Sequence, residues 1–169
     1  MLFNSFSYAV FVPIIFIIYW FMPHRFRWVL LLAASYYFYM SWNPKYIILI
    51  LATTFISYIT GIVIEQTENK LQKKVYLVLS VIFCMGILFI FKYFIENLSS
   101  VLDIFTIKMH PITLKLLLPV GISFYTFQTM SYVIDVYRGD VQAEKHFGYY
   151  AAFISFFPQL VAGPIERTE

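Results

Sequence analysis

Five residues between positions 121 and 135 combine small, phenolic, amide and carboxylate groups at a helical spacing: Gly121, Tyr125, Gln128, Tyr132 and Asp135. At 3.6 residues per turn they fall within an arc of roughly 80° on one helix face. Hydrocarbon offers these groups no hydrogen-bond partner, so in lipid the face must point into protein or a watery cavity. The pattern therefore indicates either the lining of a path or a packing seam between helices.

Each end of this predicted helix allows two interpretations. Asp135 and Arg138 have the i,i+3 spacing of an ion pair worth a few tenths of a kcal/mol. Otherwise Arg138 binds an anionic ligand, since a guanidinium presents a planar fork of donors to phosphate oxygens. At the other end, Pro119 predicts either a helix that starts near Lys115 and kinks, or one that starts at Pro119 itself.

A second candidate region lies at the end of the chain. Pro158, Gly163 and Pro164 interrupt an otherwise apolar run and predict a broken or re-entrant helix. Breaks of this kind are tolerated at membrane depth only inside protein, so these three residues are interpreted as structural. Glu166 and Arg167 follow directly and are candidates for the mouth of a path.

The elements that carry these residues are predicted to be membrane helices. The chain has 169 residues, of which 61 % are hydrophobic and 12 % charged, about half the charge of a typical soluble domain. A helix that crosses hydrocarbon needs roughly 20 apolar residues. We therefore expect an all-α bundle of about six transmembrane spans, the last one broken, in a single domain over residues 1–169, built from the charge-free runs Met1–His24, Trp28–Pro44, Tyr46–Ile64, Val75–Phe91, Leu116–Ile134 and Phe147–Ile165.

The segments between these runs are predicted from their polarity. Glu65–Lys74 (EQTENKLQKK) is the most polar stretch and is expected to be a solvated loop. Glu96–Thr113 is the longest link, and its apolar middle predicts a short surface helix near Val101–Phe105. Within the third run we expect four hydroxyls to bond back to carbonyls of the preceding turn: those of Thr53, Thr54, Ser57 and Thr60.

The basic residues bear on orientation rather than on nucleic-acid binding. The net charge is +3, but the twelve Lys and Arg residues are spread over the loops, so no nucleic-acid-binding patch is predicted. With the amino terminus outside, seven basic residues lie in the cytoplasm and four outside, with Lys92 uncounted because it falls within a helix; the positive-inside rule favours this orientation. The seven are Arg25, Arg27, Lys70, Lys73, Lys74, Arg138 and Lys145.

Two segments together resemble the membrane-bound O-acyltransferase superfamily, and most closely its bacterial branch of alginate O-acetyltransferases. They are LPVGISFYTFQTMSYVIDVYRG at 118–139 and FISFFPQLVAGPIER at 153–167. Further matches are the opening FNSFSYAVFVPIIFIIYWFMPHRFR, then SYYFYMSWNPKYIILIL at 35–51 and FKYF at 91–94. The resemblance thus covers essentially the whole chain, with a departure at Ser57, where relatives often carry an acid.

The resemblance implies an enzyme of the bacterial cytoplasmic membrane that moves an acyl group, usually acetyl, across the bilayer. The donor would be a cytoplasmic thioester, acetyl-CoA or an acyl carrier, with no bound cofactor or metal. The acceptor would be a surface polysaccharide such as alginate, or a periplasmic partner protein that passes the acetyl group on.

The catalytic residues of the family are not expected in this chain. The family's catalytic histidine lies well after the GPIER segment, and His24, His110 and His146 fall in loops without its motif. The resemblance therefore implies the amino-terminal part of a larger enzyme, inactive when tested alone. Two other classes fit the same pattern of helices: a transporter or channel subunit, and a scaffold that binds another membrane protein.

Overall fold

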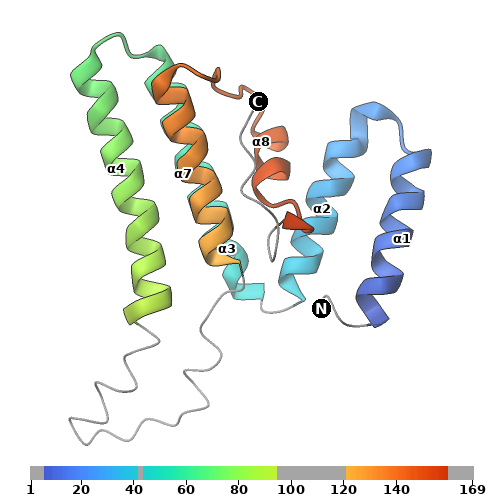
Figure 1. Ribbon diagram of the computed structural model, residues 1–169. Helices are drawn as coiled ribbons and strands as arrows, with labels where there is room; N and C mark the ends of the chain where they lie inside the picture. Colours follow the sequence, from blue (N-terminus) through green and yellow to red (C-terminus); the bar gives the residue numbers. More distant parts are fainter. Residues whose placement is uncertain (1–5, 42–43, 95–120, 160–169) are drawn as a thin grey trace, which may run out of the picture.

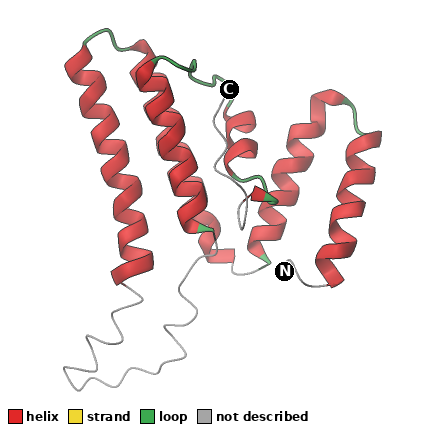
Figure 2. Cartoon of the chain, in the orientation of Figure 1, coloured by secondary structure: helices red, strands yellow, loops and turns green. Residues whose placement is uncertain are grey.

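The structure is a computed structural model that describes residues 6–41, 44–94 and 121–159. Within these ranges the chain forms helices joined by turns and loops, which confirms the predicted all-α class (Figure 2). Its elements are α1 (Phe6–Phe21), η1 (His24–Phe26), α2 (Arg27–Met40), η2 (Pro44–Tyr46), α3 (Ile47–Gln66), α4 (Lys70–Leu88), η3 (Phe89–Phe94), α7 (Ile122–Arg138) and α8 (Phe147–Ile154). Of the short elements, η1 and η2 are 3-10 turns and η3 is a π-helical end of α4.

Helix α7 makes its most extensive contact, in the described part of the bundle, with α3. It packs against α3 and α4, which form a hairpin, while the short α8 lies between α3 and α2 (Figure 1). Helix α1 packs on α2 at the far edge of the row, and its Phe11 ring also meets the ring of Phe157, after α8, at 5.5 Å. Figure 1 also shows that α3 and α7 run in the same direction, with α4 returning between them in the chain.

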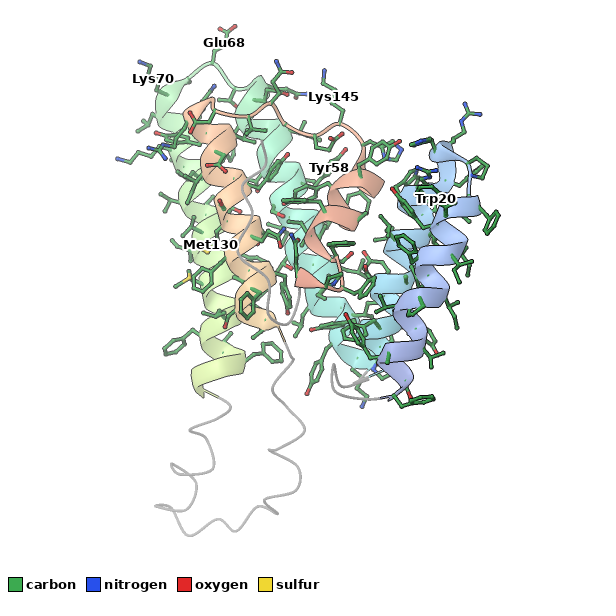
Figure 3. The ribbon with its side chains drawn as sticks, turned by 45° about the vertical axis from the view of Figure 1, so that its right-hand side comes forward. Trp20, Tyr58, Glu68, Lys70, Met130 and Lys145 are labelled. Carbon is green, nitrogen blue, oxygen red and sulfur yellow. The ribbon has the colours of Figure 1, made fainter. Side chains whose placement is uncertain are left out.

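The turns after α1, α3 and α7 lie at the same end of the bundle (Figure 1). Figure 3 places the side chains of Glu68, Lys70 and Lys145 together at this end. The basic residues that the sequence assigns to one side of a membrane therefore do share one end of the described structure.

Two helices are long and apolar enough to cross a membrane. They are Pro44–Gln66, with 23 residues, and Lys70–Phe91, with 22. Helix α1 is a shorter apolar helix of 16 residues, and α8 has only 8, about 12 Å at 1.5 Å per residue. Of the six expected spans, two therefore appear among the described residues as candidate membrane-crossing helices.

The prediction of a solvated loop over Glu65–Lys74 is wrong, because helix occupies most of it. Helix α3 continues to Gln66 and α4 begins at Lys70, so only Thr67–Asn69 connects them. The Asn69 side chain caps α4, accepting a hydrogen bond from the Leu71 N–H at 2.9 Å. Such a cap satisfies one of the unpaired N–H groups of a helix start, so the polar residues form the first turn of α4.

Helix α7 starts at Ile122, directly after Gly121. Gly121 has φ 76°, in the left-handed region that glycine enters without steric cost. The helix thus begins three residues after Pro119. Lys115, Pro119 and the expected surface helix near Val101–Phe105 lie outside the described residues, so the choice between the two starts stays a prediction. At the other end of the chain α8 stops at Ile154, and Pro158 is exposed in the turns that follow. Gly163 and Pro164 lie outside the described residues.

Among the described residues, apolar side chains lie on the outside and polar side chains inside, the opposite of the arrangement in a soluble protein. Large apolar side chains face outward on α1 and α4, with Phe21 83 % exposed and Ile82 62 % exposed. Polar side chains are buried between the helices: Ser35, Thr53, Thr54, Ser57, Ser80, Thr126, Gln128, Thr129 and Ser155. An apolar surface of this extent in water is rare, so the distribution fits a helical membrane protein.

The ring of Tyr132 on α7 lies against Gly61 on α3. A Cβ atom added at Gly61 would lie 2.8 Å from the ring and the hydroxyl of Tyr132. That separation is shorter than any ordinary carbon contact, so glycine is required for α7 to lie this close to α3. Gly86, on α4, has no atom within 4 Å of such a Cβ.

We predict that Gly61→Ala destabilises the protein by about 1–3 kcal/mol, the usual cost of overpacking a filled interior. The matched control Gly86→Ala should leave stability equal or raise it by up to about 1 kcal/mol, since alanine favours helix over glycine. The unfolding midpoint of the purified protein in detergent measures both. Equal midpoints for the two variants would contradict the close approach at Gly61.

Candidate functional site

Helix α7 buries the face that the polar stripe predicts. Tyr125, Tyr132 and Gln128 are 0 %, 2 % and 6 % exposed. Asp135 is half-buried and Arg138 is exposed. The stripe thus enters the bundle at Tyr125 and reaches the surface at Arg138.

The Tyr132 side chain fixes the end of α7 against its neighbours. Its hydroxyl accepts a hydrogen bond from the Glu144 N–H at 3.0 Å. Its ring lies 4.5 Å from the ring of Tyr150 on α8 and covers Gly61 on α3. Tyr132 is therefore a packing residue in this structure, which is one of the two roles expected for the stripe.

Gln128 connects α7 to α8. Its amide Nε2 donates to the Phe153 carbonyl at 3.5 Å, a long hydrogen bond. Phe153 belongs to the last turn of α8, where carbonyls have no partner within the helix. Because this contact is long, Gln128 is held less firmly than Tyr132.

A buried hydrogen bond that the sequence does not single out joins α8 to α3. The Tyr150 hydroxyl donates to Ser57 Oγ at 2.7 Å, and Ser57 Oγ donates to the Thr53 carbonyl at 2.7 Å. Both side chains are nearly or fully buried. Ser57 therefore has a defined hydrogen-bond partner on α8 in this chain.

Residues 143–145, which we call the 143–145 loop, are tied to α3 by two further hydrogen bonds. The Ala143 N–H donates to Glu65 Oε1 at 3.2 Å, and the Tyr58 hydroxyl donates to the Lys145 carbonyl at 2.7 Å. The loop between α7 and α8 is thus positioned by α3 and α7 together.

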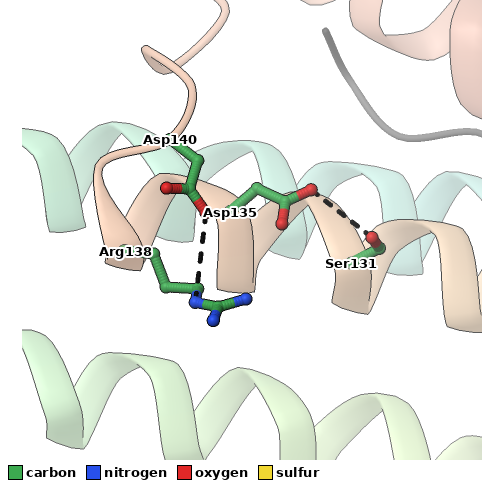
Figure 4. Close-up of polar contacts among 4 residues, drawn as sticks. All are labelled: Ser131, Asp135, Arg138 and Asp140. Atoms are coloured by element: carbon green, nitrogen blue, oxygen red, sulfur yellow. Dashed lines mark hydrogen bonds and ion pairs between the residues drawn. The ribbon is translucent and has the colours of Figure 1, made fainter.

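The expected ion pair between Asp135 and Arg138 is not the one that forms. Arg138 Nε lies 3.9 Å from Asp140 Oδ2, and Asp135 Oδ2 instead accepts a hydrogen bond from Ser131 Oγ at 3.4 Å (Figure 4). Gly139, with φ 81°, ends the helix and brings Asp140 back toward Arg138. Both partners of this pair are more than 60 % exposed, so its contribution to stability is small.

The hydroxyls of α3 follow the prediction with one exception. Thr53, Ser57 and Thr60 donate to carbonyls of the preceding turn at 2.7–2.9 Å. The hydroxyl of Thr54 is buried without a hydrogen-bond partner. The same is true of the hydroxyls of Tyr39, Tyr125 and Thr126.

The histidines among the described residues lie at the ends of helices. His24 contacts Arg27 in the turn after α1, at 3.0 Å from ring Nε2 to Nη1. His146 caps α8, where its Nδ1 accepts from the Tyr149 N–H at 3.4 Å, and its ring lies 5.0 Å from that of Trp28. Neither faces the buried polar groups, and the described residues contain no cluster suited to a metal ion. Glu166 and Arg167 lie outside them.

An apolar exterior around an interior of hydroxyl and amide groups defines a protein of the helical membrane class. Comparison with curated proteins gives the family. The chain is 38 % identical over 162 residues to the probable alginate O-acetylase AlgI of Azotobacter vinelandii, which covers 94 % of this chain and 32 % of that protein. It is 38 % identical over 161 residues to the Pseudomonas aeruginosa protein of the same name, with 94 % and 31 % covered.

The similarity extends beyond alginate. A Helicobacter pylori peptidoglycan O-acetyltransferase is 34 % identical over 162 residues, covering 80 % of this chain and 30 % of that protein. The chain belongs to the membrane-bound O-acyltransferase superfamily and spans about a third of the length of these relatives. No family model matches the chain, and no solved structure matches it.

We predict that Ser57 and Tyr150 are energetically coupled. Ser57→Ala leaves the Tyr150 hydroxyl unpaired and Tyr150→Phe removes the donor, so each should cost about 1–3 kcal/mol. The double variant should cost less than the sum, by about 1 kcal/mol. Tyr76→Phe, on the exposed face of α4, is the matched control. Strict additivity of Ser57→Ala and Tyr150→Phe in detergent unfolding would contradict the hydrogen bond.

Proposed function

We propose that this chain forms part of an integral-membrane O-acyltransferase that acetylates a hydroxyl group of a cell-surface polysaccharide, such as alginate. The observation that carries the proposal is the similarity to the alginate O-acetylases, at 38 % identity over 94 % of the chain. The donor would be a cytoplasmic thioester, acetyl-CoA or an acyl carrier. The acetyl group would reach the polymer directly or through a periplasmic acetyl-transfer partner protein.

Within such an enzyme, the role that fits the described residues is binding and positioning rather than proton transfer. Acyl transfer to a hydroxyl needs a base near the acceptor oxygen and a donor at the developing oxyanion. His24 and His146 lie at helix ends, away from the buried polar face of α7. This face, with Tyr125 and Gln128, would line the path along which donor and acceptor meet.

The location proposed is the bacterial cytoplasmic membrane, with the amino terminus outside. Two helices of sufficient length and an apolar outer surface support insertion into a lipid bilayer. The basic residues gathered at one end of the bundle support a cytoplasmic position for that end (Figure 3).

We predict that Gln128→Ala lowers acetylation by about ten- to a hundredfold if its amide positions a substrate, the scale of removing one charged or hydrogen-bonding contact from a transition state. The measurement is O-acetyl content of the polysaccharide in cells whose own gene is replaced by the variant. Gln142→Ala, at an exposed loop position, is the matched control and should keep full activity.

The result is interpreted against the amount of folded protein. A Gln128 that only connects α7 to α8 predicts a lower unfolding midpoint with normal activity per folded molecule. No acetylation from the unaltered full-length gene product, with any thioester donor, would overturn the proposed function itself.

We predict that cysteines at Glu68 and Gln142 react with a membrane-impermeant maleimide only after the cells are permeabilised. A cysteine at Asp103 should react in intact cells, because one helix crossing separates it from the Glu68 end. Cys84 is replaced by alanine in all variants, since it is the only cysteine in the chain. If the cysteines at positions 68 and 142 were labelled from opposite sides of the membrane, the two turns would not share one end of the bundle. If both were labelled from outside, the proposed orientation would be inverted.

A further inference from the structure

Four buried hydroxyl groups in the described part of the chain make no hydrogen bond of regular geometry, and the two phenols among them interact with each other. The four hydroxyls belong to Tyr39 on α2, Thr54 on α3, and Tyr125 and Thr126 on α7. Tyr39 is 5 % exposed and the other three are 0 % exposed. Nearly all buried hydroxyls in proteins are paired with protein or ordered water, because an unpaired one is unfavourable. Four in one small bundle call for a physical cause.

The four hydroxyl-bearing residues lie at one level of the bundle. Tyr132 covers Gly61 where the parallel helices α3 and α7 meet. Seven residues earlier on each helix, which is two turns along nearly the same face, are Thr54 and Tyr125. Thr126 is the next residue on α7, and the ring of Tyr39 meets that of Tyr125 edge-on at 6.4 Å. We call these four residues the hydroxyl cluster.

The two threonines of the cluster do not bond to the backbone carbonyl that lies nearest to them on their own helix. In a helix a threonine hydroxyl can donate to the carbonyl three or four residues earlier. Thr53 does so to Leu49 at 2.9 Å, and Thr129 does so to Thr126 at 2.8 Å. Their neighbours Thr54 and Thr126 do not. Hydroxyls that forgo this bond remain available to another group.

The chemistry of the cluster defines what it accepts. Each phenol and each threonine hydroxyl donates one hydrogen bond and accepts others, and none carries a charge. The cluster therefore offers no opposite charge to balance a buried ion, whereas a neutral oxygen finds both hydrogen-bond donors and acceptors there. A buried water typically makes about three such hydrogen bonds.

We propose that the hydroxyl cluster is a binding site for a neutral oxygen ligand. Water molecules occupy it at rest, and the carbonyl or hydroxyl oxygen of a substrate displaces them. The second half of this proposal rests on the proposed acyltransferase function, whereas the first half does not. Gln128, one turn along α7 from Tyr125, lies next to the cluster on the path that the polar stripe would line.

The test is X-ray radiolytic footprinting of the full-length gene product in ¹⁸O-labelled water. Water bound beside a side chain produces hydroxyl radicals in place, so buried tyrosines become labelled only where water is present. Tyr39 and Tyr125 should take up ¹⁸O several-fold faster than Tyr150, which is equally buried but bonded to Ser57. Uptake no faster than that of Tyr150 would overturn the proposal.

Two further arms locate the ligand and identify its source. Tyr125→Phe should reduce uptake at Tyr39, and Tyr39→Phe should reduce uptake at Tyr125, because both phenols bind the same water; unchanged uptake in both variants would refute a shared site. Addition of acetyl-CoA separates the two sources. Protection of Tyr39 and Tyr125 from labelling supports displacement by a substrate oxygen, and unchanged labelling supports a site for water alone.

Discussion

The close contact of Tyr132 with Gly61 sets the geometry of the described bundle. It lies between two parallel helices, α3 and α7, and a methyl group at Gly61 would collide with the Tyr132 ring. The same tyrosine accepts the Glu144 N–H and packs on Tyr150, so the 143–145 loop and α8 take their places from it. Gln128 and three of the four residues of the hydroxyl cluster lie on the same two helices, along the contact that Tyr132 makes with Gly61.

Around the contact, the interior is held by small polar groups rather than by charge. Ser57 links Tyr150 to the Thr53 carbonyl, and Tyr58 and Glu65 fasten the 143–145 loop. Hydroxyls bonded in this way cost little desolvation and fix the register of apolar helices that would otherwise slide. Where hydroxyls lack partners, as in the hydroxyl cluster, the same interior becomes able to take up a ligand.

Many features of the described helices can be predicted from local sequence patterns. The helical class, the burial of Tyr125, Gln128 and Tyr132, and the back-bonding of Thr53 all follow from apolar runs and a 3.6-residue period. The early start of α4 was missed because polarity suggested a loop where Asn69 caps a helix. The Ser57–Tyr150 bond and the Arg138–Asp140 pair could not be predicted, since they depend on a tertiary approach and on the left-handed Gly139.

The parallel pairing of α3 with α7 has a consequence for biosynthesis. The partners of α3 are made late: Tyr150 follows Ser57 by 93 residues, and Ala143 follows Glu65 by 78. A ribosome therefore delivers the α3–α4 hairpin to the membrane before the helix that fills its hollow at Gly61 exists. Until then the hydroxyls of Thr54 and Ser57 are covered only by whatever the insertion machinery or the lipid provides. A nascent chain that ends before Ile122 therefore lacks the helix that covers this face of α3.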